Sequence, residues 1–186
     1  LGTYKDRYKY YLIFEIVVVI FGNVCYNWFD KLEFVEAKDM EIREIKENKK
    51  QFLSLLLLAD EQEDMIDRYL DKGRMYVLDD DGVKCECVVT DEGNDVLEIK
   101  NIATVPECQG KGYAKALIDY VVEKYSKQYT VLQVGTGDSP LTIPFYEKCG
   151  FVRSHIVPNF FTDNYDHPMY ECGVQLVAMV YLQRTL

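Results

Sequence analysis

One stretch, Val96–Tyr125, constrains the fold of this 186-residue chain more than any other. It begins with the apolar residues of a strand, breaks at Pro106, and passes through the two glycines of Gln109-Gly110-Lys111-Gly112. It then continues with apolar residues at the i, i+3, i+4, i+7 spacing of a buried helix face. The first turn of such a helix exposes unpaired N–H groups, and these groups together with the helix dipole favour an anion. The stretch therefore predicts a site for a phosphate-bearing ligand.

The motifs in and around this loop indicate which ligand that is. The chain contains neither a G-x-x-x-x-G-K-[ST] loop nor the G-x-G-x-x-G order of a dinucleotide site. Instead, Gln109-x-x-Gly112-x-Ala114 resembles the Q/R-x-x-G-x-G/A signature of the GNAT acetyltransferase superfamily. Asn101–Pro106 resembles the fourth strand of that family, and Phe145–Phe151 (FYEKCGF) resembles its Y-E-K-x-G-F run. These features occur in the order of the family, and the resemblance covers residues 39–186.

The resemblance implies an α/β (α+β) fold of the GNAT acyl-CoA N-acyltransferase type. Such a fold has a mixed, mostly antiparallel central sheet of about seven strands, flanked by helices, with a splayed cofactor cleft between its middle strands. Hydrophobic periodicity and turn residues predict the remaining elements. Strands are expected at 41–45, 75–78, 84–90, 130–134, 151–156 and 174–182, and helices at 49–59, 61–70 and 141–148.

The same resemblance implies that the cofactor is acetyl-CoA. Backbone N–H groups of the loop would hold its pyrophosphate, and the adjoining strand edge would pair with pantetheine like an added strand. Asp138 or Ser139 stands near the position of a family asparagine that binds the pantetheine arm. The expected cofactor-binding residues are Ile102, Ala103, Thr104, Val105, Gln109, Gly110, Lys111, Gly112, Tyr113, Ala114, Lys115, Asp138, Ser139 and Tyr146. No metal site is expected, because no second Cys/His pair with zinc spacing accompanies Cys85 and Cys87.

Acetyl transfer from a thioester to an amine needs a donor that polarises the carbonyl and an acid for the leaving thiolate. The resemblance assigns the first role to a backbone N–H, that of Thr104 or Val105. It assigns the acid to Tyr146, which holds the position of the tyrosine in the Y-E-K-x-G-F run. The alternative is that Tyr146 packs against pantetheine without giving a proton.

The reaction also needs a base, because an alkyl amine is protonated at neutral pH. Glu98, on the central strand, is the first candidate, and the two histidines, His155 and His167, follow it. Cys108 and Cys149 are not expected to act as nucleophiles, because GNAT enzymes transfer the acetyl group directly and no Cys–His pair is evident.

The acceptor side is expected to be walled by the two helices at 49–59 and 61–70. Asp60 is expected to be the N-cap of the second helix, and Gly73 its stop. We interpret the acidic run Asp60, Glu61, Glu63 and Asp64 as solvated helix surface, with attraction of a cationic substrate as the alternative. The aromatic insertion Pro158–Cys172 favours a closed pocket for a small molecule.

The expected function is therefore acetyl-CoA-dependent N-acetylation of a primary amine, as in a bacterial GNAT subgroup without a defined acceptor. Two alternatives remain open. One is an inactive acyl-CoA-binding regulatory module, and the other is acetylation of a protein lysine or N-terminus. The net charge of −10 argues against nucleic acid as a partner. Scattered cysteines favour a reducing, cytoplasmic location, and a homodimer is possible.

Residues 1–38 lie outside the resemblance. Lys5, Arg7 and Lys9 precede the apolar run Leu12–Phe21, a pattern found in membrane anchors. Glu15 within this run argues against an anchor, so a membrane partner is not expected. We interpret the segment as a hydrophobic extension that packs on the domain or on a second copy. The alternatives are an anchor or a stretch that does not belong to the natural protein.

Overall fold

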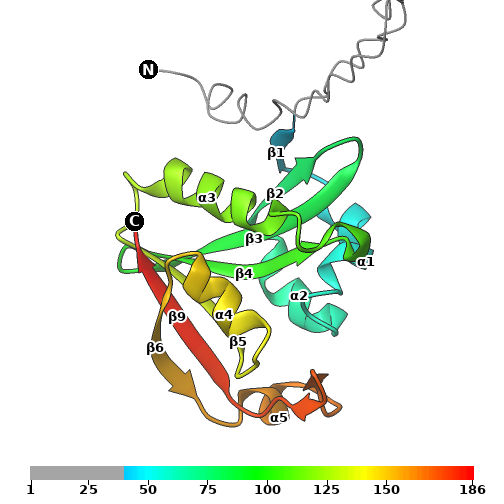
Figure 1. The fold of residues 1–186 in the computed structure, drawn as a ribbon, viewed down its shortest axis with the longest axis vertical. Helices are drawn as coiled ribbons and strands as arrows, with labels where there is room; N and C mark the ends of the chain where they lie inside the picture. The colour runs from blue at the N-terminus through cyan, green and yellow to red at the C-terminus, as the bar shows by residue number, and fades with distance from the viewer. Residues whose placement is uncertain (1–39) are drawn as a thin grey trace, which may run out of the picture. The chain divides into compact units, whose positions relative to one another are not determined.

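The computed structural model describes residues 40–186, and the interpretation of residues 1–38 lies outside this range. The described residues form a seven-stranded sheet in the order β1-β2-β3-β4-β5-β9-β6 and a two-stranded ribbon, β7-β8 (Figure 1). In chain order the elements are β1 Glu41–Ile45, η3 Lys49–Phe52, α1 Leu53–Leu56, α2 Glu63–Leu70, β2 Arg74–Asp79, β3 Val83–Gly93, β4 Val96–Thr104, η4 Pro106–Cys108, α3 Tyr113–Tyr125, β5 Val131–Gly137, α4 Thr142–Lys148, β6 Val152–Val157, α5 Phe160–Asn164, β7 Tyr170–Glu171, β8 Val174–Gln175 and β9 Met179–Thr185.

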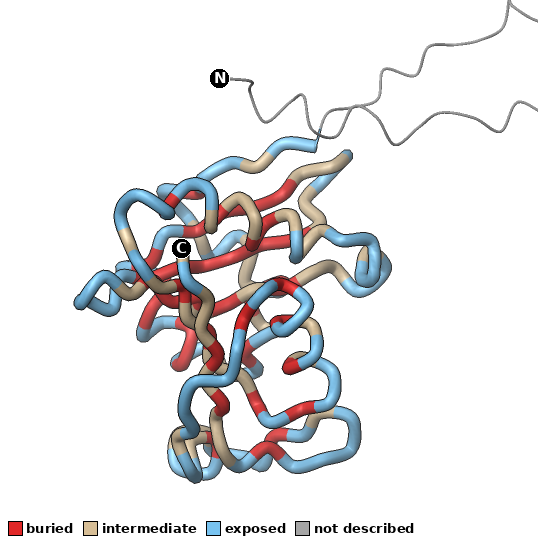
Figure 2. The backbone as a smooth tube through the Cα atoms, turned by 60° about the vertical axis from the view of Figure 1, so that its left-hand side comes forward, coloured by how far each residue is buried: buried red, intermediate tan, exposed pale blue. Residues whose placement is uncertain are grey.

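Helices cover both faces of the sheet. Alternating residues of β3 show the division: Cys85 and Cys87 belong to the core under α3 and α4, whereas Val88 belongs to the core under α1 and α2. The central strands are accordingly the most buried part of the described chain, and β6 at the edge is mostly exposed (Figure 2). No helix within residues 40–186 is long and apolar enough to cross a membrane.

The sheet opens between β4 and β5. These strands pair in parallel only from Val96–Ile99 to Val131–Val134, whereas every other pairing in the sheet is antiparallel. Beyond Ile99, β4 stays paired with β3, and beyond Val134, β5 stays paired with β9. The expected mixed, mostly antiparallel sheet with splayed middle strands is therefore confirmed.

The acceptor side departs from the sequence expectation. The helix expected over 49–59 is shorter, and only η3 and α1 form, up to Leu56. The N-cap of α2 is Gln62 and not Asp60, so the expected capping role of Asp60 is wrong. Gly73 follows α2, but a Cβ there would lie 2.6 Å from Val88 Cγ1, so close packing rather than a left-handed stop requires the glycine.

The strands after α3 also differ in their bounds from the sequence expectation. β5 continues to Gly137 because β9 pairs with it along its whole length, so Gly135–Gly137 is strand and not loop. The expected last strand, 174–182, divides into the short β8 and the later β9. The insertion forms α5 and ends at the β7-β8 ribbon.

Candidate functional site

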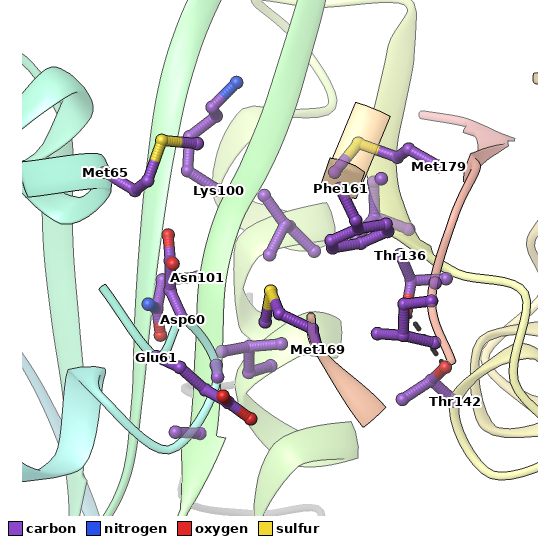
Figure 3. A pocket seen from close by; sticks show the side chains of 18 of the residues that line it. Asp60, Glu61, Met65, Lys100, Asn101, Thr136, Thr142, Phe161, Met169 and Met179 are labelled. Atoms are coloured by element: carbon purple, nitrogen blue, oxygen red, sulfur yellow. Dashed lines mark hydrogen bonds between the residues drawn. The ribbon is translucent and has the colours of Figure 1, made fainter. Parts of the chain in front are cut away.

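A cavity of about 550 Å³ opens where β4 and β5 separate. One wall consists of β4 and the segment from α1 to α2, and the other consists of β5, β9, α4 and the insertion (Figure 3). Among the residues expected from the sequence, Glu98, Ile102, Ala103, Thr104, Gln109 and Tyr146 line it. The expected phosphate-binding loop adjoins this lining through Gln109.

The loop that precedes α3 depends on two glycines. Gly110 and Gly112 have φ values of 76° and 89°, which side-chain-bearing residues rarely adopt, and a Cβ on either would meet no atom within 4 Å. Gly112 is the N-cap of α3, and its carbonyl accepts from the N–H of Ala116 at 2.9 Å. The N–H groups at the start of α3 have no acceptor within the helix and adjoin open space, so this loop can hold an anion.

Side chains fix the orientation of the loop. The hydroxyl of Tyr113 donates to Asp80 in the β2-β3 turn at 2.6 Å, which ties the start of α3 to the hairpin. Lys115 pairs with Asp119 at 2.5 Å, and Lys111 is exposed. Ala114 is partly buried against the core.

The cavity-facing edge of β4 follows from its pairing with β3. The N–H of Val105 donates to the carbonyl of Lys84 at 2.9 Å, and hydrogen-bonded and non-hydrogen-bonded pairs alternate along antiparallel strands. The N–H of Ala103 therefore points to β3, whereas those of Ile102 and Thr104 point to the side from which β5 has departed. Val105 is thus already hydrogen-bonded, and Ile102 provides a second cavity-facing donor beside Thr104.

Tyr146 lies on α4 and borders the cavity, although its side chain is only 7% exposed. Its ring makes edge contacts with Phe145 and Phe151, at centroid distances of 5.1 and 5.7 Å. Burial raises the pKa of the phenol above its ordinary value, so the hydroxyl keeps its proton at neutral pH. It can therefore donate a proton to a group in the cavity.

Asp138 and Ser139, one of which is expected to bind the pantetheine arm, are not among the residues that line the cavity. Asp138 pairs with Arg153 at 3.5 Å, and the Ser139 hydroxyl accepts from the N–H of Leu141 at 3.1 Å. Thr136 and Thr142, hydrogen-bonded to each other at 2.9 Å, line this wall instead. Sequence reasoning missed Thr142, although it precedes Tyr146 by four residues and so shares its helix face.

Glu98 is a buried carboxylate in the cavity lining, on the last part of β4 that pairs with β5. One oxygen accepts from Lys100 Nζ at 2.8 Å, and the other accepts from Gln133 Nε2 at 2.9 Å. Gln133 in turn accepts from Gln183 at 2.7 Å. The carboxylate is therefore held in place at the point where the strands separate.

The two histidines lie outside the cavity lining. His155 on β6 stacks on Tyr181 at a centroid distance of 4.5 Å. His167 is exposed between Asp166 (2.5 Å) and Glu61 (3.4 Å), and these carboxylates raise the pKa of its imidazole. Neither is as well placed as Glu98 to receive a proton from a group in the cavity.

The cysteines do not line the cavity in residues 40–186. Burial raises the pKa of the Cys85 thiol to about 12 and also raises the pKa values of Cys87 and Cys149. A thiol that keeps its proton is a poor nucleophile, and this agrees with the expectation that Cys149 does not attack. No cluster of three or more potential metal ligands is found within residues 40–186.

Comparisons with known proteins bear on this arrangement. Residues 71–153 match the model of the acetyltransferase (GNAT) domain family. The chain is 34% identical over 140 residues, 74% of its length, to the uncharacterized N-acetyltransferase YvbK of Bacillus subtilis (strain 168), of which it covers 90%.

Two solved structures contain the cofactor or its product. A GNAT family acetyltransferase from Elizabethkingia anophelis with acetyl-CoA bound is 32% identical, with a TM-score of 0.76 over 80% of this chain and 99% of that one. An acetyltransferase from Bacillus subtilis in complex with CoA is 33% identical, with a TM-score of 0.73 over 80% of this chain and 99% of that one.

Proposed function

Because the chain belongs to the GNAT family of N-acetyltransferases, which use acetyl-CoA, we propose that it moves the acetyl group directly to a primary amine of a small molecule. One observation carries the proposal: a single cavity is lined by the free edge of β4, the protonated phenol of Tyr146 and the carboxylate of Glu98. These are the three kinds of group that the reaction needs.

The described residues fit acetyl-CoA at two places. The loop with Gly110 and Gly112 leaves open space beside the N–H groups at the start of α3, which suits a pyrophosphate. The unpaired edge of β4 offers donors and acceptors to the two amides of pantetheine. When bound, acetyl-CoA supplies an acetyl group activated as a thioester.

The two cavity-facing N–H groups of β4, those of Thr104 and Ile102, lie at different distances from the loop. Thr104 is nearer the loop, and its carbonyl accepts from the Gln109 side chain at 3.5 Å. Ile102 lies two residues deeper, beside Asn101 and the acceptor wall. We therefore assign Thr104 to the pantetheine arm and the Ile102 N–H to polarisation of the thioester carbonyl.

Two side chains, Glu98 and Tyr146, carry out the proton transfers. Glu98 takes a proton from the ammonium group of the acceptor, directly or through water, and so generates the nucleophilic amine. Tyr146 gives its proton to the leaving thiolate and recovers one as the new amide nitrogen loses its second proton. The ordered position of both groups in one lining also favours an enzyme over an inactive acyl-CoA-binding module.

A small molecule is favoured over a protein as the acceptor because of the insertion. Phe160, Phe161 and Tyr165 line the cavity on the side facing α1 and α2 and narrow it there. A peptide needs an open groove, whereas these rings suit a compact amine. Asp60 and Glu61 in the same lining would favour a cation.

We further propose a cytoplasmic homodimer. The five cysteines found within residues 40–186 are free thiols, which suits a reducing compartment. The edge strand β6 exposes 67% of Val152 and 58% of Ile156, which suits contact with a second copy. Sedimentation velocity of the full chain and of Val152→Lys tests the dimer, and a monomeric wild type would contradict it.

The experiment that tests the proposed function measures release of free CoA thiol from acetyl-CoA with a panel of amines. Polyamines, aralkylamines, amino acids and short lysine peptides are compared, and N-acetylated product is identified by mass spectrometry. We expect turnover with a small-molecule amine and a kcat reduced about 10²–10⁴-fold in Tyr146→Phe, the usual contribution of a positioned acid.

Tyr120→Phe serves as the matched control, because Tyr120 lies on α3 and does not line the cavity. It should keep the wild-type kcat. Tight acetyl-CoA binding without turnover on any amine would favour the binding-module alternative, and turnover confined to peptides would favour a protein acceptor.

A further inference from the structure

The loop between α1 and α2 directs one buried carboxylate, that of Asp60, into the acceptor end of the cavity. The residue is 8% exposed and lines the cavity (Figure 3). One oxygen accepts from the hydroxyl of Tyr69 at 3.3 Å, and the other accepts from the hydroxyl of Tyr165 at 3.1 Å. The backbone N–H of Gln62 also donates to this carboxylate, which is thus held by three neutral donors.

Asp60 differs from Glu98 in the charge beside it. Glu98 is neutralised by Lys100 at 2.8 Å, whereas Asp60 forms no ion pair with any residue from 40 to 186. Arg68 and Lys72 border the same cavity, but neither pairs with it. A buried carboxylate without a positive partner is costly, and burial raises its pKa. A cation entering the cavity would therefore gain most by binding here.

Tyr165, whose hydroxyl contacts this carboxylate, belongs to an aromatic cluster in the cavity lining. The ring of Tyr165 stacks on Phe161 at a centroid distance of 5.7 Å, and Phe160 makes edge contacts with both. Met65 and Met169 complete the apolar surface beside it (Figure 3). A cavity lined by both a carboxylate and apolar or aromatic side chains favours an ammonium group attached to an apolar body.

Hydrogen bonds connect Asp60 to β4, the strand whose N–H groups face the cavity. The Tyr69 hydroxyl that donates to Asp60 accepts from Asn101 Nδ2 at 2.8 Å, and Asn101 immediately precedes Ile102 on β4. Asn101 also donates to the carbonyl of Leu56 at 3.0 Å. Any group held at Asp60 is therefore fixed relative to the N–H groups that face the cavity.

Two parts of the chain far apart in sequence meet to build this position. Tyr165 comes from the insertion, 105 residues after Asp60. The neighbouring Asp166 N–H donates to the Gln62 side chain at 3.4 Å, and His167 contacts Glu61. The insertion thus docks on the α1-α2 loop through three successive residues.

We propose that Asp60 and Tyr165 form an ammonium-binding subsite that selects positively charged amines with an apolar or aromatic body as acceptors. This inference rests on the proposed function, because it names the acceptor class of the same cavity. The carboxylate receives the ammonium, Tyr165 orients that carboxylate, and the rings of α5 contact the apolar body.

Binding of two matched probes to the full chain with CoA present tests the subsite. Benzylamine is a cation at neutral pH, whereas O-benzylhydroxylamine is a primary amine of similar shape that is uncharged there. We expect calorimetry to show benzylamine binding at least about tenfold more tightly, the size of a hydrogen bond to a charged group. Asp60→Asn should abolish this preference, and Tyr165→Phe should reduce it.

Asp64→Asn is the matched control, because Asp64 is an exposed acid on α2 that does not line the cavity, and it should keep the preference. Thermal unfolding of each variant shows whether it is folded, and Tyr165→Phe retains the test if Asp60→Asn is not. A preference that persists in Asp60→Asn, or is absent from the wild type, would overturn the subsite. Acetyl-CoA affinity and turnover, measured on the same samples, report separately on the proposed function.

Discussion

The two ends of the cavity are built from different kinds of group, backbone at the cofactor end and side chains at the acceptor end. At the cofactor end, backbone groups dominate: two glycines with positive φ, the start of α3 and the N–H groups of Ile102 and Thr104. At the acceptor end, side chains dominate, and the contacts that place them join residues far apart in sequence, as between Asp60 and Tyr165.

Each end should therefore tolerate different substitutions. A backbone site is insensitive to most side-chain changes but fails when a position loses its special conformation or its N–H. A side-chain site can change its specificity through single substitutions while the fold is kept. The cofactor end should therefore be fixed, and the acceptor end adjustable.

Among the substitutions that distinguish the two ends, removal of one backbone donor is expected to have the strongest effect. Ile102→Pro deletes the N–H that faces the cavity and spares the hydrogen bonds between β4 and β3. We expect kcat to fall about 10²–10³-fold, the usual effect of losing one donor to a developing oxyanion, while acetyl-CoA affinity changes little. Steady-state kinetics and calorimetry measure the two quantities.

Ala103→Pro is the contrasting variant, because the N–H of Ala103 points to β3, and it should destabilise the fold instead. An unchanged kcat in folded Ile102→Pro would remove this N–H from the mechanism and leave Thr104 as the donor.

The next effect tests the glycine at the start of α3. Gly112→Val places a branched residue at a φ of 89°, beside the space assigned to the pyrophosphate. We expect the Kd of acetyl-CoA to rise about hundredfold, a loss of roughly 2.7 kcal/mol. Gly93→Val is the matched control, since Gly93, the last residue of β3, has a φ of 78° and equally open surroundings. Equal loss of affinity in both variants would show that general strain, not the loop, is responsible.

A smaller effect is expected from replacing Glu98, whose charged side chain lies between the two ends. Glu98→Gln keeps the shape and the contact with Gln133 but removes the proton acceptor. We expect kcat/KM at neutral pH to fall about tenfold to hundredfold and to recover as the pH approaches the pKa of the amine. A pH–rate profile checks this. A profile identical to that of the wild type would transfer the role of base to another group, with Asp60 the first candidate.

The last test concerns the stability of the strand that both ends share, not catalysis or binding. Glu86 pairs across the ladder with Ala103, and its carboxylate is fully buried. Burial raises its pKa from an ordinary 4.5 to about 8. Between these pH values the folded chain holds a proton that the unfolded chain releases, so the free energy of unfolding should fall as the pH rises, by up to about 1.4 kcal/mol per pH unit.

Urea unfolding of the wild type and Glu86→Gln from pH 5 to pH 8 measures this effect. The difference in stability between the two should shift in favour of the variant as the pH rises. A difference that is independent of pH would show that Glu86 is ionised in the folded chain.

The cofactor end could be predicted from the sequence to a larger extent than the acceptor end. The Val96–Tyr125 stretch forms the expected strand, loop and helix, because its apolar spacing and glycines are local signals. The seven-stranded sheet and its splay followed from the resemblance carried by this stretch and by Phe145–Phe151, and the family match confirmed that resemblance.

What could not be predicted depends on tertiary contacts. Asp60 satisfied a local capping pattern, but the hydroxyls of Tyr69 and Tyr165 take its oxygens, and Gln62 becomes the N-cap. The cavity-facing N–H of Ile102 follows only from the register with β3, which no single strand reveals. The roles of Tyr146 and Glu98 stay predictions, now with a defined place in one cavity.

The most direct test of this account is the crystal structure of the chain with CoA and an amine accepted in turnover. We expect the pyrophosphate on the N–H groups at residues 110–115, pantetheine between β4 and β5 on the N–H of Thr104, and the amine between Ile102 and Asp60. A pyrophosphate bound away from this loop, or an amine bound outside the cavity lined by Glu98, would contradict it.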